Sequence, residues 1–201
     1  MAPTPEEIVR ECYDDPALVE RVAHRTTPSK MEIVEPDPAW PQTFAALKAL
    51  IVDALGPTAV VVEHTGSTSV PGLPAKDIID IDLTVPDPTD EAAYVARLEA
   101  AGFHFLLREP AWHQHRFFCR YEPTANLHVF GPDATEPVRH RIFRDWLRSH
   151  PEDKELYAET KREAMRASSQ SGEDMMQYTD RKDAVVRGIL QKAFRSLGYI
   201  D

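Results

Sequence analysis

The chain has 201 residues and a mass of 22.7 kDa, a size that suits one domain of ordinary dimensions with a short appendage. Hydrophobic residues make up 42% and charged residues 28% of the sequence, which is close to the average of globular proteins and argues against a disordered chain. The 33 acidic and 23 basic residues leave a net charge of −10. Proteins that wrap duplex nucleic acid usually carry the opposite sign, so we expect no nucleic-acid partner.

The first residues and the cysteine content bear on the compartment. The N-terminal stretch is acidic and lacks the basic and apolar regions of a signal peptide. No apolar run is long enough to cross a bilayer. The two cysteines, Cys12 and Cys119, are too few for a disulfide framework or a cysteine-based zinc site. These features predict a cytoplasmic protein with no membrane partner.

Residues 1–30 are predicted to form a helical extension. Thr4 and Glu7 have the spacing of a capping box, with a proline at the first helical position. A second short helix is expected to begin at Pro16 and to carry the apolar residues that follow. Residues 24–30 resemble a linker.

The main domain, residues 31–201, alternates between strand and helix patterns and then becomes helical only. The expected strands are 31–34, 59–62, 78–85, 103–107, 113–121 and 126–130, and the expected helices are 41–55, 90–101, 137–149, 151–167 and 173–197. The last two strands are predicted to form a hairpin. This order predicts an α+β (α/β) fold, with a mixed β-sheet flanked by helices and a helical C-terminal half.

Two aspartates lie on the expected strand 78–85. Residues two apart in a strand point to the same face, so Asp80 and Asp82 stand side by side while Ile81 faces the core. Two carboxylates on one face repel each other unless a cation lies between them. Mg²⁺ binds to such carboxylates together with substrate phosphates. We predict that both aspartates are catalytic and hold Mg²⁺.

The turn before this strand offers donors for a phosphate group. Gly66 allows a ligand to approach the backbone closely. The backbone N–H groups of the turn and the hydroxyls of Ser67, Thr68 and Ser69 can surround phosphate oxygens, and Lys76 adds a positive charge. Together with the aspartates, this turn predicts a site for a metal–nucleotide complex, suited to phosphoryl or nucleotidyl transfer.

Several histidines and arginines allow more than one interpretation. His113, His115 and His128 lie on neighbouring expected strands and invite a zinc hypothesis, but hydrogen-bonded structural histidines are the commoner outcome. Arg116 projects either toward phosphate or toward a surface acid. The basic stretch 139–148 is either a surface face that balances nearby acids or a patch that faces phosphate or RNA.

A strand, a Gly-Ser turn and, about a dozen residues later, an Asp-x-Asp pair form a known signature. In this respect the chain resembles the polymerase-β-like nucleotidyltransferase superfamily. The longer string at 64–76, followed by 78–81, resembles the GrpB family more specifically. Further matches to that family lie at 37–40, 126–129 and 143–148, and in the pairs Tyr157 with Lys161 and Tyr178 with Lys182. The resemblance covers about residues 31–193 and leaves 1–30 outside.

The resemblance implies a nucleotidyltransferase-like fold, with a nucleotide on the Gly-Ser turn and Mg²⁺ on the aspartate pair. It also implies Tyr178 and Lys182 as ligand contacts. Active transferases of the superfamily usually carry a third acid on a later strand. The matching segment here offers His128, which we predict as a further metal ligand, while Glu122 lies in an expected turn. Some relatives are fused to dephospho-CoA kinase, where the domain is thought to help folding.

These observations lead to a prediction of function. We predict a Mg²⁺-dependent nucleotidyltransferase that transfers a nucleoside monophosphate from a nucleoside triphosphate to a hydroxyl or phosphate acceptor of a small molecule. Ser67 and the backbone around Gly66 would hold the triphosphate. The alternative is a nucleotide-binding or folding-accessory module with the same fold and no turnover. A third interpretation, an RNA-modifying transferase, is disfavoured by the net charge of −10.

Overall fold

The computed structural model describes residues 2–11, 16–27, 32–171 and 175–201. Six strands form one mixed sheet in the order β1-β4-β5-β6-β3-β2. Strands β3 and β6 pair in parallel, and the other neighbours are antiparallel. The strands are β1 (Glu20–Arg21), β2 (Val61–Thr65), β3 (Ile79–Thr84), β4 (His104–Glu109), β5 (His115–Tyr121) and β6 (Thr124–Phe130). The expected hairpin is therefore confirmed as β5 and β6.

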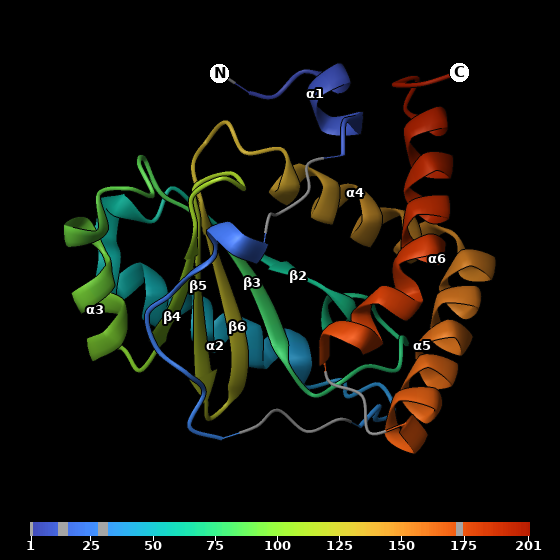
Figure 1. Cartoon of the computed structure of the whole chain (residues 1–201), viewed down its shortest axis with the longest axis horizontal. Coiled ribbons are helices and arrows are strands. Elements are labelled where there is room, and N and C mark those ends of the chain that lie inside the picture. Colours follow the sequence, from blue (N-terminus) through green and yellow to red (C-terminus); the bar gives the residue numbers. More distant parts are fainter. Residues whose placement is uncertain (1, 12–15, 28–31, 172–174) are drawn as a thin grey trace.

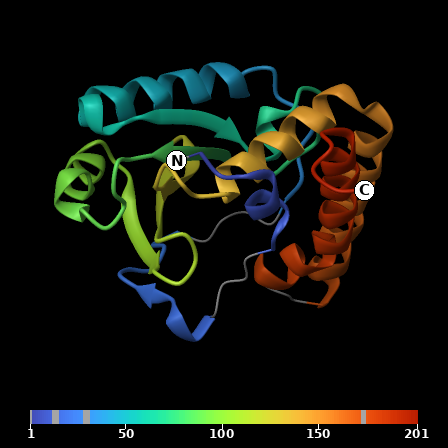
Figure 2. The same cartoon turned by 90° about the horizontal axis from the view of Figure 1, so that it is seen from above.

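Helices lie on one face of the sheet and beside its β2 edge (Figures 1 and 2). They are α1 (Pro5–Val9), α2 (Trp40–Leu55), α3 (Val95–Ala100), α4 (Glu136–Ser149), α5 (Pro151–Ser171) and α6 (Met175–Ser196), and the short 3₁₀ turns are η1 (Pro16–Leu18), η2 (Gly56–Thr58), η3 (Ser67–Ser69) and η4 (Glu91–Ala93). Helices α4, α5 and α6 pack against one another. The predicted α+β fold with a helical C-terminal half is confirmed. None of the described helices is both long and apolar enough to cross a bilayer.

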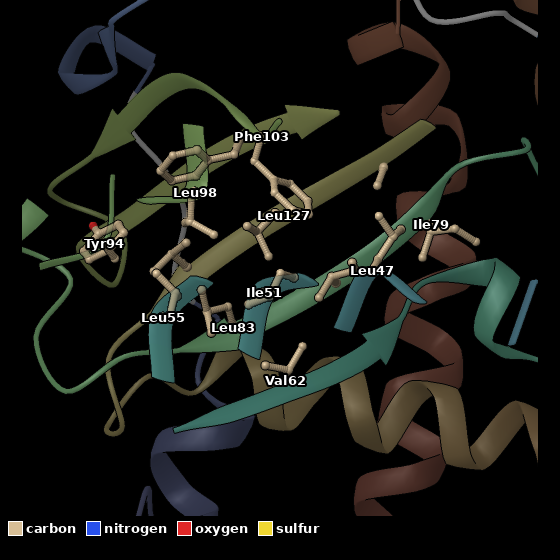
Figure 3. Packing of buried hydrophobic residues seen from close by; sticks show 14 of the residues in the cluster. Leu47, Ile51, Leu55, Val62, Ile79, Leu83, Tyr94, Leu98, Phe103 and Leu127 are labelled. Carbon is tan, nitrogen blue, oxygen red and sulfur yellow. The ribbon is translucent and has the colours of Figure 1, made fainter. Parts of the chain in front are cut away.

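The main hydrophobic core lies between α2 and the sheet. Ile79, Ile81 and Leu83 of β3 are each at most 2% exposed, because alternate residues of a strand share a face and this face is covered by α2. The same cluster contains Leu47, Ile51 and Leu55 of α2 and Leu127 of β6 (Figure 3). The opposite face of β3 carries the two aspartates, so the alternation that builds the core also places the candidate site.

The N-terminal residues pack on the rest of the chain. The predicted capping box at Thr4 and Glu7 is present at the start of α1. Ile8 is buried against Leu190 and Phe194. The expected second helix is wrong beyond η1, because the chain there extends into β1, which pairs with β4 at the edge of the sheet.

Several further expected elements differ from the structure in type or bounds. The strand expected at 31–34 is only an isolated bridge between Val34 and Ala75, and residue 31 lies outside the described part of the chain. The helix expected at 90–101 is split into η4 and α3 at Tyr94, which is fully buried and donates a hydrogen bond to the Pro88 carbonyl. The helix expected at 151–167 continues to Ser171. The bridge to Ala75 and the buried hydrogen bond of Tyr94 account for the first two differences.

Candidate functional site

A pocket of about 270 Å³ lies between the Gly-Ser turn, β3, β6 and helices α4, α5 and α6. Its ionisable lining consists of Lys76, Asp80, His140, Arg144, Lys161 and Lys182, together with the tyrosines Tyr157 and Tyr178. Among the described lining residues, basic groups therefore outnumber the one acid, although the whole chain carries a charge of −10. Such a concentration of positive charge suits an anionic ligand.

The Gly-Ser turn is built against Asp80. Gly66 has φ 65° and ψ −171°, a combination that glycine alone adopts readily. A Cβ atom on this residue would lie 2.2 Å from Oδ2 of Asp80. The absence of a side chain therefore lets the backbone of the turn rest on the carboxylate. Ser67 and Tyr157 both line the pocket, so the turn faces α5 across it.

The two aspartates have different partners. Oδ1 of Asp80 accepts a hydrogen bond of 2.8 Å from the Asn126 amide on β6. Oδ2 of Asp82 lies 2.9 Å from Nδ1 of His140 on α4. Oδ1 of Asp82 is buried and, among the described residues, has no hydrogen-bond partner. An ionised oxygen buried without a partner is costly, and a cation bound beside it would remove that cost. The aspartate pair thus fits a Mg²⁺ ion.

The Asp82–His140 contact is an ion pair. Burial alone would raise the pKa of Asp82, but the charge of His140 and its hydrogen bond hold that pKa below its usual range. Burial alone would lower the pKa of His140, yet the Asp82 carboxylate raises it to about 9. His140 is therefore protonated at neutral pH and donates a hydrogen bond from its Nδ1–H to Oδ2 of Asp82.

His128 lies beside Asp82 across the β3–β6 pairing but is engaged elsewhere. Its Nδ1 is 3.1 Å from Nε2 of His115, which in turn contacts Glu109. Burial lowers the pKa of His128 to about 4, so its ring is neutral. Among the described residues, no group of three or more His, Cys, Asp or Glu side chains is arranged to hold a metal ion. The proposed metal site accordingly rests on Asp80 and Asp82 without His128.

Lysine and tyrosine side chains form the helical wall of the pocket. The ammonium groups of Lys76 and Lys182 lie 4.8 and 4.2 Å from the ring centre of Tyr178. Lys161 lies 4.8 Å from that of Tyr157 and donates to the Pro74 carbonyl. Burial, followed by the neighbouring positive charges, lowers the pKa of Lys161 to about 7. Burial also lowers the pKa of Lys182 to about 8 and depresses that of Lys76.

Most of the predicted phosphate contacts meet in this pocket, but three do not act as expected. The Thr68 hydroxyl donates to the Ile78 carbonyl, and the Ser69 hydroxyl donates to the Gly66 carbonyl at 2.6 Å. Both hydroxyls therefore stabilise the turn itself. Arg116 is buried, pairs with Glu91 at 2.7 Å and lies outside the pocket. Strand alternation places it on the core face of β5, so the proposed site does not include Arg116.

The basic stretch of α4 contributes residues that the sequence interpretation left open. His140, Arg144 and Arg148 recur every four residues and thus share one helix face. Arg144 donates to the His64 carbonyl at 3.0 Å, and Arg148 donates to the Ser69 carbonyl at 2.7 Å. This helix face therefore binds the backbone on both sides of the Gly-Ser turn. The spacing of four was the signal that could have linked these residues to the turn.

The depressed pKa of Lys161 predicts a pH dependence of stability. In the unfolded chain this lysine holds its proton up to about pH 10.5, whereas in the folded protein it loses the proton near pH 7. The unfolded state binds more protons between these values, so the free energy of unfolding rises with pH across that window. We expect Lys161→Met to flatten this rise, as measured by urea unfolding at pH 7, 8, 9 and 10. Equal pH slopes for the two proteins would contradict the assignment.

The chain is similar in sequence to a family model and to several bacterial proteins. The family model described as GrpB protein matches residues 30–192. The chain is 41% identical over 165 residues to the UPF0157 protein BH1888 of Halalkalibacterium halodurans, covering 82% of this chain and 83% of that protein. It is 42% identical over 170 residues to the UPF0157 protein PA4798 of Pseudomonas aeruginosa, covering 82% and 68%.

Two further similarities concern a longer enzyme and a solved structure. The chain is 30% identical over 161 residues to the dephospho-CoA kinase of Mycolicibacterium paratuberculosis, a match that covers 67% of this chain and only 39% of that enzyme. The crystal structure of conserved protein GrpB from Enterococcus faecalis aligns with a TM-score of 0.69 and 25% identity, covering 83% of this chain and 99% of that chain. The GrpB structure therefore has the same mixed α and β architecture.

Proposed function

This chain belongs to the GrpB family, and from that premise we propose that it is a Mg²⁺-dependent nucleotidyltransferase. It would transfer a nucleoside monophosphate from a nucleoside triphosphate to a hydroxyl or phosphate group of a small acceptor. The observation that carries this proposal is the contact between the Gly66 turn and Asp80 within a pocket lined by lysines. A close backbone approach, fixed positive charge and a carboxylate for a metal ion are the parts that nucleotidyl transfer needs.

Each part of the pocket has a role in this proposal. Asp80, which lines the pocket, and Asp82, which is buried two residues along β3, would hold Mg²⁺, which supplies positive charge to the phosphates when bound. Lys76 and Lys182 would bind phosphate oxygens, and the Ser67 side chain would orient them. His140 keeps Asp82 ionised and fixed in position. The protein thereby contributes charge and orientation, which account for most of the catalysis in phosphoryl transfer.

The proposed reaction is an in-line displacement at the α-phosphorus. The acceptor oxygen forms the new phosphorus–oxygen bond while the bond to the bridging oxygen breaks and pyrophosphate leaves. Where the acceptor is a hydroxyl, a carboxylate of the aspartate pair takes its proton. The lysine wall would stabilise the negative charge of the departing pyrophosphate.

One observation favours the alternative, a nucleotide-binding module without turnover. In the parallel pairing of β3 and β6, Asn126 lies opposite Asp80 and His128 lies opposite Asp82. Neither residue supplies the third carboxylate that active transferases usually carry in the polymerase-β-like superfamily, which this chain resembles. A site with two carboxylates can still bind Mg²⁺ through substrate phosphates, so the alternative differs from the main proposal only in turnover.

Thermal unfolding with nucleotides tests whether the site binds its proposed substrate. A ligand that binds only the folded state at about 100 times its dissociation constant stabilises that state by about 2.7 kcal/mol. We expect at least one nucleoside triphosphate to raise the melting temperature by about 5 °C in the presence of Mg²⁺. Asp80→Asn should lose this increase, while Asp53→Asn, which changes an exposed carboxylate on α2, should keep it.

The outcomes separate the two functions. No increase with any nucleotide at millimolar concentration would overturn the transferase and the nucleotide-binding module, and would favour the folding-accessory module with the same fold. An increase without pyrophosphate release, over a panel of alcohols and phosphate monoesters, would favour the module. Pyrophosphate release that depends on one acceptor and is lost in Asp80→Asn would establish the transferase.

A further inference from the structure

The N-terminal segment, here residues 16–27, crosses the face of the sheet that carries the candidate site. It lies on the side of the sheet away from α2 (Figures 1 and 2). The backbone N–H groups of residues 22 and 23 donate to the Leu106 carbonyl of β4 at 2.8 and 3.1 Å. The N–H of Thr26 donates to the Tyr121 hydroxyl of β5 at 2.7 Å. These hydrogen bonds attach the segment to β4 and β5.

Between these anchors, Arg25 reaches the floor of the candidate site. Its Nη2 donates to Oδ1 of Asn126 at 2.6 Å, and its guanidinium lies 5.7 Å from the ring centre of Phe117. The Asn126 amide nitrogen donates in turn to Oδ1 of Asp80 at 2.8 Å. Two hydrogen bonds in series therefore connect the N-terminal segment to the carboxylate that rests on Gly66.

The chemistry of the two ends fixes the orientation of the amide between them. An asparagine amide can be turned by 180° with little change in shape. Arginine is only a donor, however, and an ionised carboxylate is only an acceptor. A single orientation of Asn126 satisfies both partners, with its oxygen toward Arg25 and its nitrogen toward Asp80. Without Arg25, water could pair with either end of the amide, and the bond to Asp80 would no longer be enforced.

We propose that Arg25 is a positioning residue of the site, which orients Asn126 and through it holds the Asp80 carboxylate against the Gly-Ser turn. This inference deepens the proposed function and, for the effect on nucleotide binding, rests on it. Arg25 lies outside residues 30–192, the stretch that the GrpB family model matches. The segment before the family domain therefore supplies a part of the site in this chain.

The first test reads the amide directly and needs no ligand. In ¹⁵N–¹H spectra, the two protons of the Asn126 side-chain amide, assigned with Asn126→Asp, should be widely separated because one of them is bonded to Asp80. We expect Arg25→Ala to reduce this separation and Arg25→Lys to restore part of it. Arg21→Ala, which removes an exposed arginine of β1, should leave it unchanged. An unchanged Asn126 amide in Arg25→Ala would overturn the proposal.

The second test measures the affinity for Mg²⁺ and the nucleoside triphosphate selected by the thermal assay. Loss of a residue that orients a metal ligand commonly costs about tenfold or more in affinity, so we expect Arg25→Ala to bind about tenfold more weakly. Millimolar ethylguanidinium should recover part of the loss, which a merely structural defect would not allow. Equal affinity of wild type and Arg25→Ala would refute the positioning role. Absence of nucleotide binding in the wild type would refute the proposed function, and the amide spectra would still decide the role of Arg25.

Discussion

Gly66→Ala is expected to destabilise the protein by about 3 kcal/mol or more and to abolish nucleotide-dependent stabilisation. Two costs add at this position. The backbone conformation, with φ 65° and ψ −171°, is strained for any residue with a side chain. The new Cβ would also lie 2.2 Å from Oδ2 and 2.9 Å from Cβ of Asp80. Asp80 can yield only by leaving the turn and breaking its bond to Asn126, which would dismantle the candidate site.

Gly56→Ala is the matched control for this substitution. Gly56 also has a positive φ, 56°, but a Cβ there would meet nothing within 4 Å. Gly56→Ala therefore introduces backbone strain alone. The difference between the two variants in the free energy of unfolding, measured in urea, isolates the contact with Asp80. We expect Gly56→Ala to keep the nucleotide-dependent increase in melting temperature. If Gly66→Ala is no less stable than Gly56→Ala, the turn does not rest on Asp80.

The parts of the site that lie close together in sequence could be predicted without a structure. Strand periodicity places Asp80 and Asp82 on one face and Ile81 on the other, and β3 follows this pattern. The turn at Gly66 directly follows β2, and Thr65 at the end of β2 pairs with Asp80, so the turn approaches Asp80 through the antiparallel pairing of two strands that are neighbours in sequence. These predictions depend on backbone regularity, which a sequence pattern reports directly.

The partners of these residues could not be predicted in the same way. His140 meets Asp82 only because α4 docks beside β2, and Arg25 meets Asn126 only because the N-terminal segment crosses the sheet. Strand β1 has just two residues, too few to show any periodicity. The partner of Arg116 stays open in the sequence, because the face of β5 that carries it depends on the pairing of β5 with β6. Long-range docking thus decides which polar groups complete the site.

The Asp82–His140 pair gives the second large effect, because Asp82 is almost fully buried. Removing one partner of a buried ion pair typically costs about 3–5 kcal/mol, since the other charge stays buried without compensation. The His140 side chain is 30% exposed and that of Asp82 is 4% exposed, so water can reach the site of a deleted imidazole in part. We therefore expect His140→Ala to lower the free energy of unfolding by about 3 kcal/mol at pH 7.

Arg141→Ala is the control on the neighbouring residue of α4. Its guanidinium pairs with Glu63 at 2.9 Å, the same length as the His140 contact, but both side chains are more exposed, at 42% and 27%. Such surface pairs contribute about 0–1 kcal/mol. Equal losses in the two variants would mean that burial does not strengthen the Asp82 contact. The double variant Asp82→Asn with His140→Ala should be more stable than His140→Ala alone, because it no longer buries an unpaired charge.

The pH dependence of this cost identifies the charge of His140 as its source. The pKa of His140 rises from 6.5 to about 9 in the folded protein, so the ion pair contributes fully below pH 6.5 and its contribution is lost as the pH rises through about 9. The cost of His140→Ala should therefore be larger at pH 7 than at pH 10, where a neutral hydrogen bond remains. A cost that is equal at both values would show that the imidazole acts by packing alone. Mg²⁺ should also stabilise wild type more than Asp82→Asn, because the wild type has at this position an ionised oxygen with no hydrogen-bond partner in the described part of the chain.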